Sequence, residues 1–175
     1  MAEFEIEKAN DKEYVLQKVK EDGKNLDLVS PELKDDKEVV MAAIMQNPIA
    51  LEFASDNLKN DKEIVMNSVS KVGWTACYAS EKLRADKELF LAGVQIDGQI
   101  LYYASKELRD DEEVVLAAVK NKGLILKYAS RRLRNNKEII LAAISQDKRA
   151  KEYIDSEELK QDEDIQKILN PPATE

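Results

Sequence analysis

Carboxylates return at a fixed spacing along this chain, and grouped carboxylates can bind metals or exchange protons. The triplet Asp36-Lys37-Glu38 recurs with a 25-residue period. Its other copies are Asp11-Lys12-Glu13, Asp61-Lys62-Glu63, Asp86-Lys87-Glu88, Asp111-Glu112-Glu113 and Asn136-Lys137-Glu138. No stretch has the alternating acids, central Gly and terminal Glu of a calcium loop. Acidic side chains cap the free N–H groups at a helix N-terminus and are stabilised there by the helix dipole. The triplets therefore predict helix starts, and we expect neither a metal site nor a catalytic acid.

The single cysteine, Cys77, is the second candidate for chemistry. A nucleophilic thiol needs a base or a lowered pKa, and the chain contains no His. The phosphate-binding patterns Gly-x-x-x-x-Gly-Lys and Gly-x-Gly-x-x-Gly are also absent. We therefore expect a non-enzymatic protein without a cofactor, in which Cys77 is a half-buried or surface thiol.

An aromatic column could offer a stacking platform for bases. It consists of Phe53, Tyr78, Tyr103, Tyr128 and Tyr153, with Leu28 at the equivalent place in the first copy. Since Phe and Leu serve at the same position, the apolar body of the side chain matters and the hydroxyl does not. The column is interpreted as part of the core.

The fixed 25-residue period predicts stacked helical repeats. Each start signal precedes six largely apolar positions, such as Val39 to Ile44. A buried strand is an alternative for so short a run, but the caps favour helix. The fifth position is always small, which predicts a close approach of two helix backbones. Its members are Ala43, Ser68, Gly93, Ala118 and Ala143.

The long helix is expected to stop near Gly73, Gly98 and Gly123, or at the equivalent Gly23 and Pro48. Glycine favours the left-handed conformation that ends helices, and proline starts helices. These breaks argue against a continuous rod. A shorter helix then carries Leu51, Phe53 and Ala54, and Ser55 caps a last turn whose Leu58 points inward. The residues before the triplets, Asp35, Asn60, Asp110 and Asn135, are second capping candidates.

The terminal copies differ from the others. Gln17-Lys18 and Lys20 give the first helix a wetter face, and residues 155–170 hold one extra residue before Leu159. We interpret 155–170 as a C-terminal cap and 171–175 as a disordered tail. Polar end repeats keep an isolated stack soluble, so 1–175 is expected to be one complete, bounded domain with repeats starting near 11, 36, 61, 86, 111 and 136.

Composition limits the partners. The net charge of −8 argues against a generic nucleic-acid or membrane binder. The N-terminus lacks a signal peptide, no apolar run is long enough to span a bilayer, and one cysteine fits a reducing compartment. A cytoplasmic monomer without membrane contact is expected.

The pattern Asp-Lys-Glu-Val-Val-Leu-Ala-Ala-Val, followed by Gly, Leu and Tyr-Ala-Ser-x-x-Leu-Arg, resembles the repeats of domain-of-unknown-function family 4116. The resemblance covers roughly residues 11–169 and is strongest from Asp111 to Asn135. It implies helical repeats, often in multi-copy arrays in microbial proteins. It implies no catalytic residues and no substrate.

Two repeat positions vary freely in the short helix and indicate a binding strip. The first holds Lys24, Ile49, Trp74, Gln99, Leu124 and Arg149, and the second holds Asp27, Glu52, Cys77, Tyr102, Lys127 and Glu152. If equivalent residues stack side by side, the middle of this variable strip is apolar and aromatic. Trp and Tyr with apolar neighbours are typical of binding hot spots, although Trp74 filling a local gap is the alternative.

Residues 118–152 form a basic patch, with ten Lys or Arg against three acids. The patch includes Lys127, Arg131, Arg132, Arg134 and Lys137. It could contact RNA, DNA or an acidic protein, but clustering on a solvated face is the plainer explanation and no nucleic-acid motif accompanies it.

Together these patterns predict an all-α, right-handed solenoid of about six 25-residue repeats that acts as a non-enzymatic scaffold. We expect it to bind a protein partner through Ile49, Trp74, Cys77, Tyr102, Leu124, Lys127, Arg131, Arg132 and Arg134. The alternative is an acidic inhibitor or effector that mimics nucleic acid and blocks a nucleic-acid-binding target.

Overall fold

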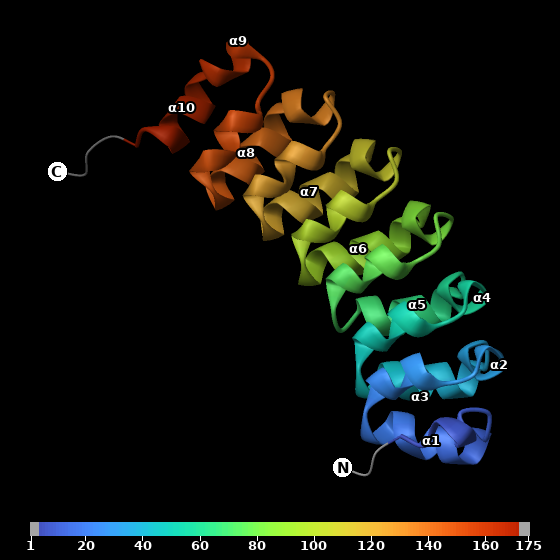
Figure 1. The fold of residues 1–175 in the computed structure, drawn as a ribbon. Helices are drawn as coiled ribbons and strands as arrows, with labels where there is room; N and C mark the ends of the chain where they lie inside the picture. The colour runs from blue at the N-terminus through green and yellow to red at the C-terminus, as the bar shows by residue number, and fades with distance from the viewer. Residues whose placement is uncertain (1–3, 172–175) are drawn as a thin grey trace. The chain divides into compact units, whose positions relative to one another are not determined.

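A computed structural model describes residues 4–171, which contain helices, turns and no strand. The chain divides into two compact units, Met1–Leu89 and Phe90–Glu175, which we call the N-terminal and C-terminal units. Their boundary lies within helix α6 (Lys87–Ile96). Each unit repeats a long α-helix, a six-residue 3-10 helix and a short last turn (Figure 1).

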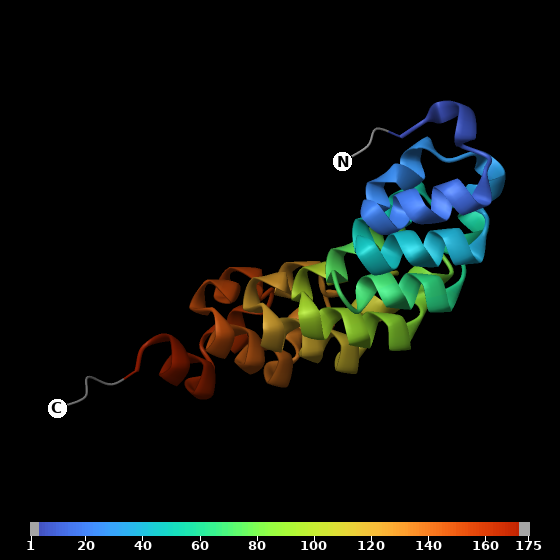
Figure 2. The same cartoon turned by 90° about the horizontal axis from the view of Figure 1, so that it is seen from below.

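The helices of the N-terminal unit follow the 25-residue period. Their bounds are η1 Ile6–Lys8, α1 Lys12–Glu21, η2 Gly23–Leu28, α2 Pro31–Lys34, α3 Lys37–Gln46, η3 Pro48–Phe53, α4 Asp56–Lys59, α5 Lys62–Val69, η4 Gly73–Tyr78 and η5 Leu83–Ala85. Within this unit α3 packs against both α1 and α5, so consecutive repeats lie side by side (Figures 1 and 2).

The C-terminal unit has the same order of elements. After α6 its bounds are η6 Gly98–Tyr103, η7 Leu108–Asp110, α7 Glu112–Asn121, η8 Gly123–Tyr128, η9 Leu133–Asn135, α8 Lys137–Gln146, η10 Lys148–Tyr153, α9 Glu157–Lys160 and α10 Glu163–Leu169. Here α7 packs against α8, and α8 against α10. The predicted all-α architecture of helical repeats is confirmed. Residues 172–175 of the predicted tail lie outside the described residues.

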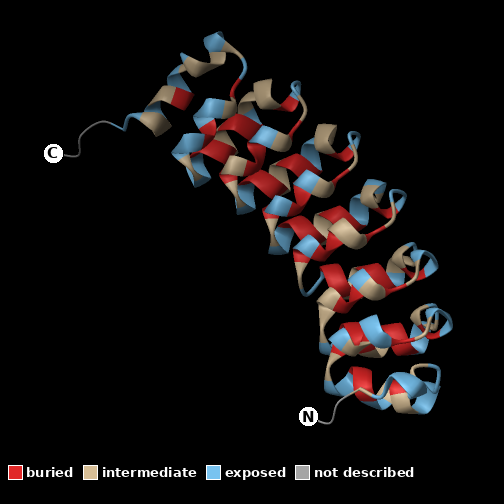
Figure 3. Cartoon of the chain, viewed as in Figure 1, coloured by how far each residue is buried: buried red, intermediate tan, exposed pale blue. Residues whose placement is uncertain are grey.

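The buried positions of the long helices show why the apolar runs form helix and not strand. In α3 the fully buried residues are Val39, Val40, Ala43 and Ile44, two neighbouring pairs one turn apart. Only a helix brings these four to one face. The same four positions are buried in α5, α7 and α8, and these buried faces run through the interior of each stack (Figure 3).

The predicted caps are confirmed at both helices of a repeat. Asp36 Oδ1 accepts the N–H groups of Glu38 at 3.0 Å and Val39 at 3.2 Å. Ser55 Oγ accepts the N–H of Leu58 at 3.2 Å, and Leu58 is buried. These bonds satisfy donors that a helix start leaves without an internal partner. The sequence signals therefore act locally, as expected.

The reason given for the glycines is wrong. No described glycine has a positive φ, so none ends its helix in the left-handed conformation. Gly23, Gly98 and Gly123 instead begin 3-10 helices, and each lies against the backbone of the next long helix. A Cβ at Gly98 would lie only 2.6 Å from the carbonyl oxygen of Ala118. Ala118 and its equivalents in α3 and α8 thus mark a close approach, as predicted, with the preceding 3-10 helix as their neighbour.

Asp35, Asn60 and Asp110 are not second caps. Their side chains accept a hydrogen bond from the capping serine of the next repeat: Ser80 Oγ lies 2.7 Å from Asn60 Oδ1, and Ser55 and Ser130 bond in the same way to Asp35 and Asp110. At the fourth such position, Asn135 accepts the N–H of Ser156 at 2.8 Å. These residues therefore tie one repeat to the next.

The predicted wet face of the first helix is only partly present. Gln17 and Lys20 are exposed, but Lys18 is buried. Its ammonium lies 3.1 Å from Glu21 Oε2 and 5.9 Å from the centroid of the Tyr14 ring. Burial of the aliphatic stem with the charge paired at the edge explains how a lysine occupies a core position.

Lysines of four triplets link neighbouring repeats, a role that the capping argument missed. Lys37 Nζ lies 2.7 Å from Asp61 Oδ2 and 2.8 Å from Glu63 Oε2 in the next repeat. Lys12, Lys62 and Lys137 make equivalent pairs of contacts. Each such Asp caps its own helix through one oxygen and pairs with the preceding repeat through the other.

These ion pairs predict loss of stability in acid. The lysines hold the pKa values of Asp36, Asp61 and Asp162 below their ordinary range. An aspartate whose pKa is lower in the folded protein than in the unfolded chain stabilises the fold at any pH above its unfolded pKa of about 3.9. This stabilisation is lost as the pH falls through the pKa of the folded state. We expect the melting temperature to fall below about pH 4 and Lys37→Met to reduce that fall. Calorimetry across pH measures both; an identical pH profile for Lys37→Met and the wild type would contradict the prediction.

Candidate partner-binding surface

The 3-10 helices determine how the variable strip is displayed. Its two positions are the second and fifth residues of each 3-10 helix, as Trp74 and Cys77 are in η4. Since a 3-10 helix has about 3 residues per turn, such residues lie above one another on one face. The third and fourth residues, Thr75 and Ala76 in η4, are buried. All twelve strip residues are exposed or half-buried.

Within each unit, neighbouring 3-10 helices pack side by side. In the N-terminal unit η3 contacts η2 and η4, and in the C-terminal unit η8 contacts η6 and η10. The strip is therefore continuous over each unit taken by itself. Ile49, Trp74 and Cys77 belong to the N-terminal unit, whereas Tyr102, Leu124 and Lys127 belong to the C-terminal unit.

Trp74 is the aromatic residue of the strip in the N-terminal unit. It is 36% exposed, and its ring lies edge-on to that of Tyr78 at 5.8 Å between centroids. Tyr78 in turn donates a hydrogen bond from its hydroxyl to Glu52 at 3.0 Å. Burial raises the pKa of the half-buried Cys77 thiol, which lowers the fraction of reactive thiolate.

The strip of the C-terminal unit contains a tyrosine cluster. Tyr102 is 55% exposed and lies edge-on to Tyr103 and to Tyr128, each at 5.0 Å between centroids. Lys127 Nζ lies 4.7 Å from the centroid of the Tyr128 ring. Edge-to-face rings and a cation over a ring are favourable contacts, so the cluster presents an ordered apolar surface with a positive charge beside it.

The interpretation of the aromatic column as core is wrong. Phe53, Tyr78, Tyr103, Tyr128 and Tyr153 are half-buried. The equivalent Leu28 is 42% exposed. The column occupies the last residue of each 3-10 helix, next to the second strip position. Sequence reasoning thus missed the partial exposure of Tyr103 and Tyr128. A three-residue period would not have found it, because that period groups the sixth residue of η6 and of η8 with the buried third residue.

Most of the named basic patch is engaged in ion pairs. Arg132 contacts Asp110 at 3.0 Å and Glu112 at 2.6 Å, and Arg134 contacts Asp155 at 3.0 Å. Lys137 also pairs with carboxylates, as described above. These acids all lie outside residues 118–152, so a charge count along the sequence overestimates the local positive charge. Arg131 and Lys127 make no ion pair within the described residues.

The extra residue at the C-terminal end has a structural role. Asp155 accepts hydrogen bonds from Arg134, and the one-residue shift that it introduces brings the backbone N–H of Ser156 to Asn135, where other repeats use the serine hydroxyl.

Of the predicted partner-binding residues, the structure brings Tyr102 and Lys127 together in one cluster. Arg132 and Arg134 instead join neighbouring repeats. No group of three His, Cys, Asp or Glu side chains in residues 4–171 is arranged to hold a metal ion.

Stacked helical units with buried faces toward each other and a variable outer strip define a helical-repeat protein. A family model described as a domain of unknown function, DUF4116, matches residues 11–59, 46–84, 61–109 and 111–160. The chain belongs to this family, and the predicted resemblance is confirmed. Searches of curated proteins and of solved structures each returned no match. Among the described helices, none has the length and apolar character needed to cross a membrane.

Proposed function

We propose that this protein is a non-enzymatic scaffold that binds a protein partner through the variable strip. The observation that carries the proposal is the ordered tyrosine cluster at Tyr102, which leaves large aromatic area exposed beside Lys127. Tyrosine and tryptophan dominate binding hot spots because they bury much apolar area with little loss of side-chain freedom. A cytoplasmic location is part of the proposal, consistent with the free thiol of Cys77.

Two features of the repeats support this assignment. The positions that stay the same from repeat to repeat make the joints between repeats, whereas the strip carries a different residue in each repeat. Variation at exposed positions of a rigid stack lets one architecture recognise one particular partner. The strip residues also lie on 3-10 helices packed against long helices, so their backbone is already ordered before binding.

Removal of the exposed rings tests the proposal. Tyr102→Ala and Trp74→Ala are each expected to weaken partner binding by about 30-fold, the effect of losing a hot spot worth about 2 kcal/mol. Both side chains are exposed, so the helical circular dichroism is expected to stay unchanged. Partners captured from native lysate and identified by mass spectrometry are then titrated against each variant.

Ile96→Ala is the matched control, because Ile96 is an exposed apolar residue at the end of α6 and outside the strip. It is expected to bind like the wild type. Partners retained equally by Tyr102→Ala, Trp74→Ala and Ile96→Ala would reject the strip as the binding surface.

The nucleic-acid mimic is the weaker proposal. Mimicry requires carboxylates that are free to replace phosphates. Asp36, Asp61 and Asp86 of the triplets, and Asp162 at the start of α10, each pair with a lysine of the preceding repeat. Capture of a nucleic-acid enzyme in a salt-sensitive complex that survives Trp74→Ala would favour this alternative over the scaffold.

A further inference from the structure

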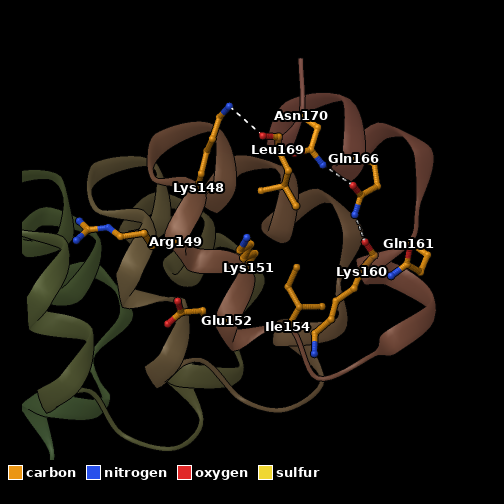
Figure 4. A pocket seen from close by; sticks show the side chains of 10 residues that line it. All are labelled: Lys148, Arg149, Lys151, Glu152, Ile154, Lys160, Gln161, Gln166, Leu169 and Asn170. Carbon is orange, nitrogen blue, oxygen red and sulfur yellow. Dashed lines mark hydrogen bonds between the residues drawn. The ribbon is translucent and has the colours of Figure 1, made fainter. Parts of the chain in front are cut away.

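The C-terminal unit contains a pocket of about 600 Å³ between η10, α9 and α10 (Figure 4). Its origin lies in the length of α10. Helix α8 has ten residues, and its last turn brings Gln146 onto the N–H of Gly123 in η8. Helix α10 has seven residues and packs on α8, so within residues 4–171 no equivalent last turn covers η10. Among the described residues, the face that other repeats bury is open here.

Cationic side chains line this pocket. Lys148, Arg149, Lys151 and Lys160 surround it, against one carboxylate, that of Glu152. Lys148 Nζ reaches across to the carbonyl oxygen of Leu169 at 3.2 Å (Figure 4). Lys151 makes no ion pair with any described residue. Two ammonium groups at the pocket therefore have no carboxylate partner among the described residues.

The other two cations are already neutralised. Arg149 lies 2.7 Å from Asp147 Oδ2, and Lys160 lies 2.6 Å from Glu157 Oε1. They lie at the edge of the pocket but attract an anionic ligand less strongly. The positive charge available to a ligand therefore comes from Lys148 and Lys151, on the η10 side.

The remaining wall combines apolar side chains with ordered amides. Leu169 is half-buried and provides apolar surface, whereas Ile154 lines the pocket but is only 2% exposed. The amide of Gln166 donates to the carbonyl of Lys160 at 2.6 Å and accepts from Asn170 Nδ2 at 2.8 Å, which fixes the side chains of α10 that face the pocket (Figure 4). Apolar surface beside unpaired ammonium groups suits a ligand that has both an apolar side chain and carboxylates.

We propose that this pocket binds an acidic peptide segment of a partner protein. An apolar side chain of the peptide lies on Leu169, and neighbouring carboxylates pair with Lys148 and Lys151. The volume falls within the range of about 300–1,000 Å³ typical of ligand sites. This proposal rests on the proposed function only in taking the partner to be a protein, because Lys148 and Lys151 are outside the variable strip.

The chemistry of the lining favours a peptide over a nucleic acid. Proteins that hold single strands usually stack bases on aromatic side chains, and no aromatic residue lines this pocket. Glu152 can accept a peptide N–H group. The side-chain amide of Gln161 can likewise pair with peptide groups.

Fluorescence anisotropy with the full chain tests the proposal. The probe is a labelled Glu-Glu-Leu-Glu-Glu peptide, compared with Gln-Gln-Leu-Gln-Gln. We expect saturable binding of the acidic peptide, weakened by salt, and about tenfold weaker binding by Lys148→Gln/Lys151→Gln. Lys151→Gln alone removes no described contact, so it reports on binding even if the double variant is destabilised.

The matched control is Lys106→Gln/Lys120→Gln, which removes two exposed lysines outside the pocket. It is expected to bind the acidic peptide like the wild type. No saturable binding by the wild type, equal weakening in the control, or tighter binding of an oligothymidine than of the peptide would each overturn the proposal. Tyr102→Ala is expected to keep peptide binding, so failure of the strip and failure of the pocket are distinguishable.

Discussion

Leu126→Ala is expected to lower the free energy of unfolding by about 2–5 kcal/mol. Leu126 is the fourth residue of η8 and is fully buried. The 3-10 helices η6 and η10 pack on either side of η8, and α7 and α8 also contact it. Truncation therefore removes apolar contacts and leaves a cavity that several elements would have to move to close. Urea unfolding followed by far-ultraviolet circular dichroism measures the loss.

Leu124→Ala is the matched control for Leu126→Ala. Leu124 allows the same substitution in the same 3-10 helix, but it is a half-buried strip residue. Its loss is expected to cost less than about 1 kcal/mol, because much of the side chain already contacts water. Equal destabilisation by the two variants would show that η8 does not face the core as described.

Gly123→Ala is expected to lower the free energy of unfolding by about 2–3 kcal/mol. A Cβ at this position would meet the backbone carbonyl of Ala143, which cannot move without α8. The φ of Gly123 is not positive, so the substitution causes no backbone strain of its own. At an open site the same change would stabilise the protein by about 0.4–1 kcal/mol, by restricting the unfolded chain. The sign of the effect therefore reports directly on the close approach of η8 and α8.

Lys148→Ala is the control for Gly123→Ala, since Lys148 occupies the same repeat position in η10. The structure already accommodates a Cβ there, because α10 does not extend over η10. A change within about 1 kcal/mol is expected, from loss of the bond to Leu169. Trp74 fluorescence reports only on the N-terminal unit, so a comparison with circular dichroism assigns the loss to one unit. A stabilised Gly123→Ala protein would refute the proposed contact.

The local signals in the sequence predict the caps correctly because each acts within a few residues. Asp36 caps a helix through N–H groups two and three residues away, and Ser55 does the same for its short helix. The 25-residue period likewise predicted the helical repeats, and the resemblance of the repeat motif indicated the family. Buried pairs such as Val39 and Val40 follow from helical periodicity once the caps are known.

Longer-range contacts could not be predicted from one repeat. Asp35 looked like a cap, but it accepts a bond from Ser55 in the next repeat. Gly123 looked like a helix end, but it lies against Ala143, which also belongs to the next repeat. An Asp fits either a helix cap or a contact with the next repeat, and a Gly fits either a helix end or a close approach. Only the position of the neighbouring repeat distinguishes the two explanations.

The candidate surface was predicted in part. Variation between repeats identified Trp74 and Tyr102, and both are exposed. The sequence assigns the half-buried Tyr128 to the core because Phe and Leu stand at the equivalent positions, but in the structure its ring lies 5.0 Å from that of the exposed Tyr102. Arg132 and Arg134 looked free because their carboxylate partners belong to neighbouring repeats.

By itself, the sequence determined the class of this protein: its repeat period, its helices, their caps and the positions that vary. Those properties depend on hydrogen bonds within a few residues and on apolar periodicity, both of which are written in the order of residues. Only the tertiary structure decided which charges are paired, which glycines mark close contacts and where a pocket is left open. Those properties depend on side chains that meet across neighbouring repeats, and their meeting is fixed by how the repeats pack.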